Sequence, residues 1–252
     1  MRLALVIVLC ASSVFADDDT AFPDAVLRWG FPGYVNSTGI VINNAGKIPA
    51  AQSHGSNRVS SGSHIWYDTA TKSIAYSNLA TIASTANCSF HSITDTNITS
   101  LQAYSMGMWV YWDAQRNDYA PVLCKLANVG GNTSLFFGMD PANKARVVVR
   151  DTGDRELLGP SALPETTWMW MGTSIGGGGA TLYLNGVGIA TNASLYTPPL
   201  TYDPAFHLNT CVYIPDAGNP YNFSGKIASL VIVPRKLSDA EMKLLYLEAP
   251  HP

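Results

Sequence analysis

The run from Tyr104 to Trp112 constrains the fold more strongly than any other segment of this 252-residue chain. Its large apolar side chains stand at both odd and even positions, so a strand formed here presents apolar groups on both faces. Such a strand must lie inside a sheet that is covered on each side. Similar runs, separated by clusters of Gly, Asn, Asp or Pro, occur at 25–31, 121–126, 135–139, 146–150, 168–174, 180–184, 211–214 and 227–233.

This succession of strand-like runs decides the fold class. No helical period lasts more than a few residues until the end of the chain, which argues against a parallel sheet with helical crossovers. The spacing of the runs is typical of an antiparallel sandwich or barrel. We therefore expect an all-β domain.

Two local patterns predict individual elements. Asn185-Gly186 follows a strand-like run, and this dipeptide best accommodates the positive φ angles of a two-residue hairpin turn. Ser238 and Glu241 form a capping-box pattern, and Leu237 can pack against Met242 at the same helix start. The sequence therefore predicts one tight hairpin and one short helix at about 239–247.

The order of these patterns resembles a known family. Leu182-Tyr183-Leu184-Asn185-Gly186 is followed by Phe223-Ser224-Gly225-Lys226-Ile227-Ala228-Ser229-Leu230-Val231-Ile232 and then by Leu237-Ser238-Asp239-Ala240-Glu241. This series is similar to the laminin G-like branch of the concanavalin A-like lectin/glucanase superfamily. The resemblance implies an antiparallel two-sheet jelly-roll sandwich with one short C-terminal helix, over residues 25–249.

The tryptophans allow two interpretations. Trp168 and Trp170 share one face of a strand, and such a pair could stack on sugar rings or belong to the core. Tryptophan flanked by methionine in a central strand favours the core, and the same interpretation applies to Trp109 and Trp112.

The N-terminal residues predict where the protein is located. Residues 1–16 combine Met1-Arg2, an apolar run and the small residues of Val14-Phe15-Ala16, the pattern of a signal peptide cleaved after Ala16. Residues 17–24 form an acidic tail before the domain. We expect a secreted, extracellular protein without membrane insertion, because no later apolar run is long enough to span a bilayer.

Cysteines and asparagines fit an extracellular chain. The mature chain keeps Cys88, Cys124 and Cys211, which allow three pairings; Cys88 with Cys124 is the preferred one, because the loop that it closes is short. The leftover thiol could be buried or could link two chains as a homodimer. N-glycosylation is predicted at Asn36, Asn87, Asn97, Asn132, Asn192 and Asn222.

The charged residues exclude several functions. A net charge of −3 without a basic run argues against nucleic acid as the main partner. Hydrolases of the family carry Glu-x-Asp-x-(x)-Glu on one strand, since retaining hydrolysis needs two carboxyls about 5 Å apart. The only glutamates, at 156, 165, 241 and 248, do not form that pattern. Asp151, Asp154 and Glu156 are interpreted as a solvated turn.

Two further kinds of site are weighed. Gly172 to Gly176 has the spacing of a nucleophile elbow, but strands follow it where the elbow needs a helix. His54 and His64 lie in a loop composition without other ligands, so no metal site is assigned. Calcium could bind loops at Asp203 and Asp216, although no ligand set can be named.

These observations favour a secreted, non-catalytic domain that binds carbohydrate or an extracellular glycoprotein. The alternatives are a structural component of an extracellular matrix, with the odd cysteine linking chains, and a polysaccharide-active hydrolase with an unusual site. The binding-domain hypothesis rests partly on the fold resemblance.

Overall fold

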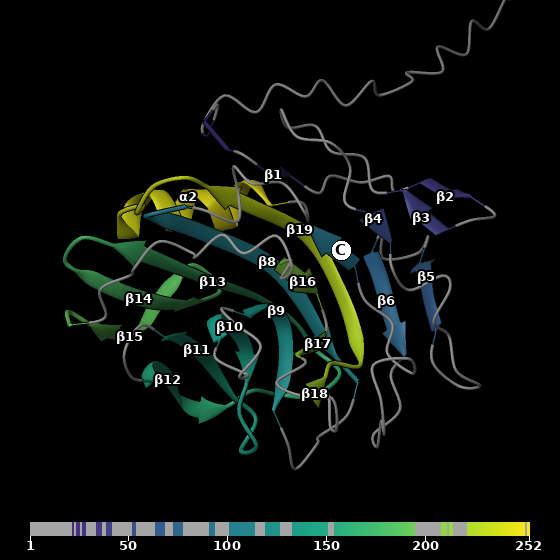
Figure 1. The fold of residues 1–252 in the computed structure, drawn as a ribbon, viewed down its shortest axis with the longest axis horizontal. Helices are drawn as coiled ribbons and strands as arrows, with labels where there is room; N and C mark the ends of the chain where they lie inside the picture. Colours follow the sequence, from purple (N-terminus) through teal and green to yellow (C-terminus); the bar gives the residue numbers. More distant parts are fainter. Residues whose placement is uncertain are drawn as a thin grey trace, which may run out of the picture.

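The computed structural model describes Phe22, Asp24, Ala25 and the ranges 27–28, 34–36, 39–41, 52–53, 64–68, 73–77, 91–93, 101–113, 119–126, 133–150, 154–194, 208–210, 212–213, 221–249 and 251–252. Within them the chain forms two large antiparallel sheets stacked face to face, with one helix outside (Figure 1). The antiparallel two-sheet sandwich with a short C-terminal helix is confirmed. Among the described residues no helix is long and apolar enough to cross a bilayer.

The first sheet has eight strands. Its path begins at the hairpin of β15 and β14 and continues through β13, β8 and β19 to β6 and β5, while β1 pairs separately with β19. The strands are β1 (Leu27–Arg28), β5 (His64–Asp68), β6 (Ser73–Ser77), β8 (Tyr104–Trp112), β13 (Trp168–Gly176), β14 (Gly179–Leu184), β15 (Val187–Asn192) and β19 (Gly225–Val233).

The second sheet has seven strands in the order β12-β11-β10-β9-β16-β7-β4. They are β4 (Gln52–Ser53), β7 (His91–Ile93), β9 (Ala120–Leu126), β10 (Thr133–Met139), β11 (Lys144–Arg150), β12 (Asp154–Ala162) and β16 (Leu208–Thr210). Two small ribbons pair β2 (Tyr34–Asn36) with β3 (Gly39–Val41), and β17 (Val212–Tyr213) with β18 (Tyr221–Asn222).

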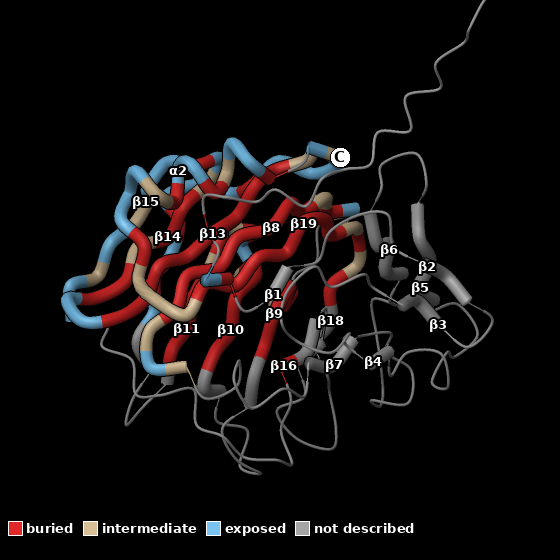
Figure 2. Tube along the Cα trace, turned by 90° about the horizontal axis from the view of Figure 1, so that it is seen from above, coloured by how far each residue is buried: buried red, intermediate tan, exposed pale blue. Residues whose placement is uncertain are grey.

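Strand β8 occupies the interior position that its composition predicts. It lies between β13 and β19, and eight of its nine residues are buried. Its even-numbered side chains, such as Met106 and Val110, belong to the cluster between the sheets, whereas Trp109 belongs to a second cluster on the outer face. Figure 2 shows buried segments along the central strands of both sheets and exposed ones along the helix and β15.

Helix α2 (Asp239–Glu248) covers part of the outer face of the eight-stranded sheet. Its N-terminus has both hydrogen bonds of the predicted capping box, between Ser238 and Glu241. Met242 and Leu237, which the sequence pattern predicted to pack together, are buried in the same second cluster, and Leu245 is buried there as well. The helix ends one residue later than expected.

A glycine pair makes room for the largest buried side chain of this cluster. Gly107 and Gly172 face each other in register on β8 and β13. A methyl group added at Gly107 would come within 2.1 Å of Trp170 Cζ2, and one added at Gly172 within 2.5 Å of Trp170 Cη2. The Trp170 indole therefore lies flat on two residues that have no side chain.

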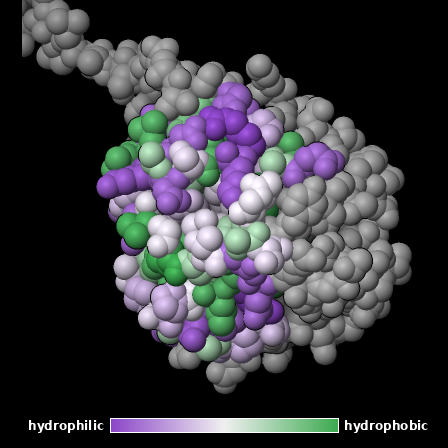
Figure 3. Space-filling model, turned by 90° about the vertical axis from the view of Figure 1, so that its left-hand side faces the viewer, coloured by the Kyte–Doolittle hydropathy of each residue, from purple (hydrophilic) through white to green (hydrophobic). Residues whose placement is uncertain are grey.

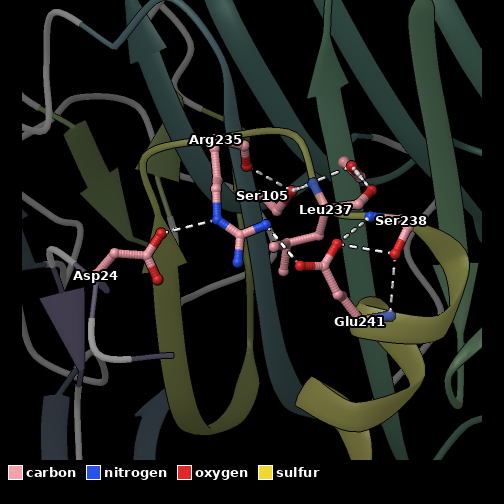
Figure 4. Close-up of polar contacts among 7 residues, drawn as sticks. Asp24, Ser105, Arg235, Leu237, Ser238 and Glu241 are labelled. Atoms are coloured by element: carbon pink, nitrogen blue, oxygen red, sulfur yellow. Dashed lines mark hydrogen bonds and ion pairs between the residues drawn. The ribbon is translucent and has the colours of Figure 1, made fainter. Parts of the chain in front are cut away.

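Arg235 ties the start of the domain to its last helix (Figure 4). Its Nε donates to Asp24 Oδ2 at 2.8 Å, and its Nη1 donates to Glu241 Oε1 at 2.6 Å. Bonds from the Ser238 backbone, from Arg235 and from the Ser238 hydroxyl lower the pKa of Glu241 to about 2.

The segment before β1 also contacts the domain. Phe22 is buried in the second cluster with 1% of its surface exposed. Phe22 and Asp24, which the sequence pattern assigned to an acidic tail, thus contribute one core side chain and one ion pair to the sandwich.

The preferred disulfide is absent from the structure. Cys124 is a free, buried thiol in β9, where it faces Phe136 of β10 in register. Cys124 therefore does not form the predicted bond with Cys88. Cys88 itself lies outside the described residues. A short loop between two cysteines lowers the entropic cost of closure, but it does not direct their side chains toward each other.

Candidate functional site

The outer face of the eight-stranded sheet carries a row of half-buried side chains beside the helix. Trp168 of β13 is in register with Tyr111 of β8, which is in register with Lys226 of β19. The Trp168 and Tyr111 ring centroids are 5.5 Å apart at an interplanar angle of 56°, and Lys226 Nζ lies 5.3 Å from the Tyr111 centroid. We call these three residues the Trp168 surface.

This row lies next to one that is completely covered. In the neighbouring row, Trp170 pairs with Trp109, and both are buried. Tyr246 of α2 lies 5.7 Å from the Trp170 ring and 5.6 Å from the Trp109 ring, and His251 lies 4.2 Å from Trp109. Trp109 Nε1 also donates to the carbonyl of Ala249 at 3.3 Å.

The four tryptophans singled out in the sequence differ in how far they are buried. Trp109, Trp112 and Trp170 are buried, as the core interpretation predicted, with 3%, 3% and 0% of their surface exposed. Trp168 packs against the second cluster but remains partly exposed. The sequence could place Trp168 and Trp170 on one face, but it could not show that the cover ends between them.

The Trp168 surface has the chemistry of a recognition platform. Aromatic rings supply apolar contact area with little conformational freedom to lose, and an ammonium group supplies hydrogen-bond donors. In the backbone register, Lys226 pairs with Ala75 of β6, and Ala75 pairs with Trp66 of β5. The platform therefore stands on strands, which hold it more rigidly than loops would.

A second group lies on the outer face of the seven-stranded sheet. Arg146 of β11 donates from Nε (2.9 Å) and from Nη2 (2.6 Å) to Oε2 of Glu156 on β12. Its guanidinium carbon lies 4.7 Å from the Tyr119 ring centroid and 5.9 Å from that of Phe136. We call Tyr119, Phe136, Arg146 and Glu156 the Arg146 cluster.

Sequence reasoning missed this cluster. It placed Glu156 in a solvated turn with Asp151 and Asp154, but Glu156 lies within β12 and its carboxylate is bound by Arg146. The two residues are ten positions apart, and they come together because β11 and β12 form a hairpin in which Val148 faces Glu156. A predicted antiparallel register between residues 144–150 and 154–162 would have been the signal that could find the pair.

The other glutamates lie in different surroundings. Glu165 is exposed before β13, Glu241 caps α2, and Glu248 is exposed at the end of that helix. The glycine run at 176–179 forms the turn between β13 and β14, as predicted in place of a nucleophile elbow. Asn185 and Gly186 have φ angles of 50° and 75°, so the predicted hairpin turn is confirmed.

Several predicted sites are outside the part that the structure describes. This applies to Asn87, Asn97, Asn132, Cys211, His54, Asp203 and Asp216, so the calcium question concerns loops that are not described. Among the described residues, no group of three or more His, Cys, Asp or Glu could hold a metal ion. Asn36 and Asn222 lie in strands β2 and β18, and Asn192 ends β15.

Asn192 is the sequon with a described side chain. It is half-buried, and its Oδ1 accepts from the Ser194 backbone N–H at 3.0 Å. It lies on an edge strand of the eight-stranded sheet. The predicted glycosylation stays a prediction.

The end of the sandwich formed by β12, β14 and β15 has a mixed surface. Figure 3 shows apolar residues scattered among polar ones in its described part. The large exposed apolar side chains of the described residues come from three elements or their ends, and they are Leu158, Val187, Leu244 and Leu247.

Comparison with known proteins addresses the fold. A family model described as the concanavalin A-like lectin/glucanases superfamily matches residues 84–243. A comparison with curated proteins finds no match.

Several solved structures share the architecture. Domain 4 of AbnA, an extracellular arabinanase from Geobacillus stearothermophilus in complex with arabinotriose, has a TM-score of 0.55 at 17% identity, over 88% of this chain and 98% of that one. The binding domain of Paraclostridial Mosquitocidal Protein 1 has a TM-score of 0.60 at 12% identity, over 88% and 52%. The binding domain of Botulinum Neurotoxin DC in complex with SialylT has a TM-score of 0.60 at 9% identity, over 89% and 51%.

This chain spans about half the length of the two toxin domains, and at these identities the similarity concerns the fold. The family model spans well over half of the chain and includes the capping box and the Asn185-Gly186 hairpin. The chain belongs to the concanavalin A-like lectin/glucanases superfamily.

Proposed function

We propose that this protein is a secreted, non-catalytic domain that binds carbohydrate through the Trp168 surface. The observation that carries the proposal is the partly exposed Trp168–Tyr111 ring pair beside Lys226, at the limit of the helix cover. Domain 4 of AbnA in complex with arabinotriose and the binding domain of Botulinum Neurotoxin DC in complex with SialylT support it as examples of similar folds.

The absence of a catalytic role is part of the proposal. Glu156 binds an arginine and Glu241 binds both an arginine and a helix start. Arginine N–H donors hold both carboxylates in a fixed direction. Neither carboxylate is therefore free to turn toward a glycosidic oxygen.

A glycan array with the secreted protein tests the proposal, in the presence of calcium and of a chelator. We expect binding to a defined set of glycans in both conditions. Trp168→Ala should raise the Kd by about 10-fold, because a central aromatic contact contributes ~1.4 kcal/mol or more to binding. Leu247→Ala is the matched control, since it removes an exposed apolar side chain elsewhere (66% exposed).

Thermal unfolding of each variant separates a binding defect from a folding defect. If no glycan binds on the array, with calcium or with the chelator, carbohydrate binding is refuted and a matrix role or a protein partner is favoured. Binding that depends on calcium and survives Trp168→Ala would instead move the site to the loops.

A further inference from the structure

Among the described residues, Arg146 uses two of its hydrogen-bond donors. A guanidinium carries five N–H donors in one plane. Two of those of Arg146, from Nε and Nη2, are directed at the same oxygen of Glu156. The other three have no acceptor among the described residues, and they include the pair on Nη1 and Nη2 that can bind a carboxylate in a bidentate manner.

Arg235 shows how the same side chain is satisfied elsewhere in the molecule. It binds two carboxylates at once, Asp24 through Nε and Glu241 through Nη1 (Figure 4). In the part of the chain that the structure describes, Arg146 has one carboxylate on the Nε side and none on the Nη1 side. Arg235 therefore shows that one guanidinium of this protein can hold two carboxylates at once, one at Nε and one at Nη1.

The surroundings hold the Arg146 guanidinium in place. Tyr119 and Phe136 lie under the group, and 17% of the Arg146 side chain is exposed. Its register neighbours are Gly138, which has no side chain, and Leu158, which is 37% exposed. A methyl group at position 138 would come within 2.2 Å of the Ala120 carbonyl oxygen, so the backbone itself requires glycine there.

We propose that the Arg146 cluster binds the carboxylate of an acidic saccharide, in the position that a second carboxylate occupies at Arg235. Arg146 supplies the bidentate N–H pair, and Glu156 orients it. The free Glu156 oxygen, Oε1, has no partner among the described residues and accepts from a neighbouring sugar hydroxyl. The carboxylate preference stands on this geometry alone, whereas the saccharide part rests on the proposed function.

Titration calorimetry with trigalacturonic acid and with its methyl ester tests the proposal on the full secreted protein. The ester keeps the sugar rings and removes the charge. We expect the acid to bind at least 10-fold more tightly than the ester. Arg146→Lys keeps the positive charge but loses the planar fork, so it should remove most of that difference.

Two controls keep the result interpretable. Arg235→Lys alters the guanidinium that already holds two carboxylates, so it should lower the unfolding temperature and leave the preference for the acid unchanged. Trp168→Ala should leave the affinity of the Arg146 cluster for the acid unchanged, because Trp168 lies on the outer face of the other sheet.

The outcomes distinguish the two proposals. Equal affinity for acid and ester, or an Arg146→Lys variant that keeps the preference, would overturn the carboxylate site. A second outcome is that the wild-type protein shows no preference for the acid and that Trp168→Ala binds neither ligand. This result would support the Trp168 surface as the binding site and reject the carboxylate site. A fall in unfolding temperature for Arg146→Lys without any change in the preference would assign Arg146 to stability.

Discussion

Adding one methyl group at Gly107 should destabilise the domain through Trp170. The new carbon would lie 2.1 Å from Trp170 Cζ2, whereas carbon atoms in contact are about 3.5–4.0 Å apart. The indole would have to move by about 1.5 Å. Met242 is buried with it in the second cluster, and the Tyr246 ring lies 5.7 Å away, so that movement is blocked.

The expected cost of Gly107→Ala follows from this confinement. Overpacking a core costs about 1–3 kcal/mol, and losing the packing of a buried tryptophan costs about 3–5 kcal/mol. We expect the free energy of unfolding to fall by about 3 kcal/mol. In a domain of this size that lowers the unfolding temperature by about 6–12 °C.

Thermal and urea unfolding measure the effect, with Gly177→Ala as the matched control. Gly177 is an exposed turn residue, and an added methyl group there meets nothing within 4 Å. That variant should stay within about 0.5 kcal/mol of the wild type. Trp170→Leu in the Gly107→Ala background removes the clash. The double variant should therefore lose clearly less free energy of unfolding than the sum of the losses of the two single variants.

The reasoning is refuted if Gly107→Ala unfolds within about 1 °C of the wild type. Full additivity with Trp170→Leu would refute it as well, because it would show that the methyl group and the indole do not meet.

Three further predictions concern titration, thiol chemistry and modification. Glu241→Gln should lower stability by about 1 kcal/mol at neutral pH, a figure reduced for the exposure of the ion pair. Because the folded pKa of Glu241 is lowered to about 2, this stabilisation is present above pH about 4.5 and is lost as the pH falls toward 2, so urea midpoints of the two proteins should converge there. Burial raises the pKa of the Cys124 thiol, so peptide mapping should find it unlabelled by a thiol reagent in the folded protein and labelled in denaturant; rapid labelling of the native protein would contradict its burial. Expressed through a eukaryotic secretory pathway, the protein should lose one glycan mass in Ser194→Ala, and an unchanged mass would exclude modification at Asn192.

Local patterns predicted the parts of the fold that depend on neighbouring residues. The capping box at Ser238 and the turn at Asn185-Gly186 each need a few adjacent side chains, and both are present. The interior position of β8 follows from its own two apolar faces. Strand β12 was missed, because Gly159 and Pro160 interrupt its pattern; an edge strand tolerates such residues, and β12 is one.

The candidate sites were harder to predict, because they depend on elements that are distant in the sequence. Trp168 and Trp170 look alike in the strand pattern, and it is α2 and the segment after it that cover one of them. Arg146 and Glu156 form a pair only once the register of β11 and β12 is known. Cys124 was assigned by loop length, although its strand position keeps it as a buried thiol.

The ion pair between Asp24 and Arg235 also has a consequence for biosynthesis. The two residues are 211 positions apart, so at about 5–20 residues per second a ribosome adds the intervening chain in about 10–40 s. During that interval Phe22, Trp109 and Trp170 lack the later members of their cluster, such as Met242 and Leu245. The outer face of the large sheet therefore closes last, and a nascent chain of this protein offers chaperones an aromatic surface until the final helix has been made.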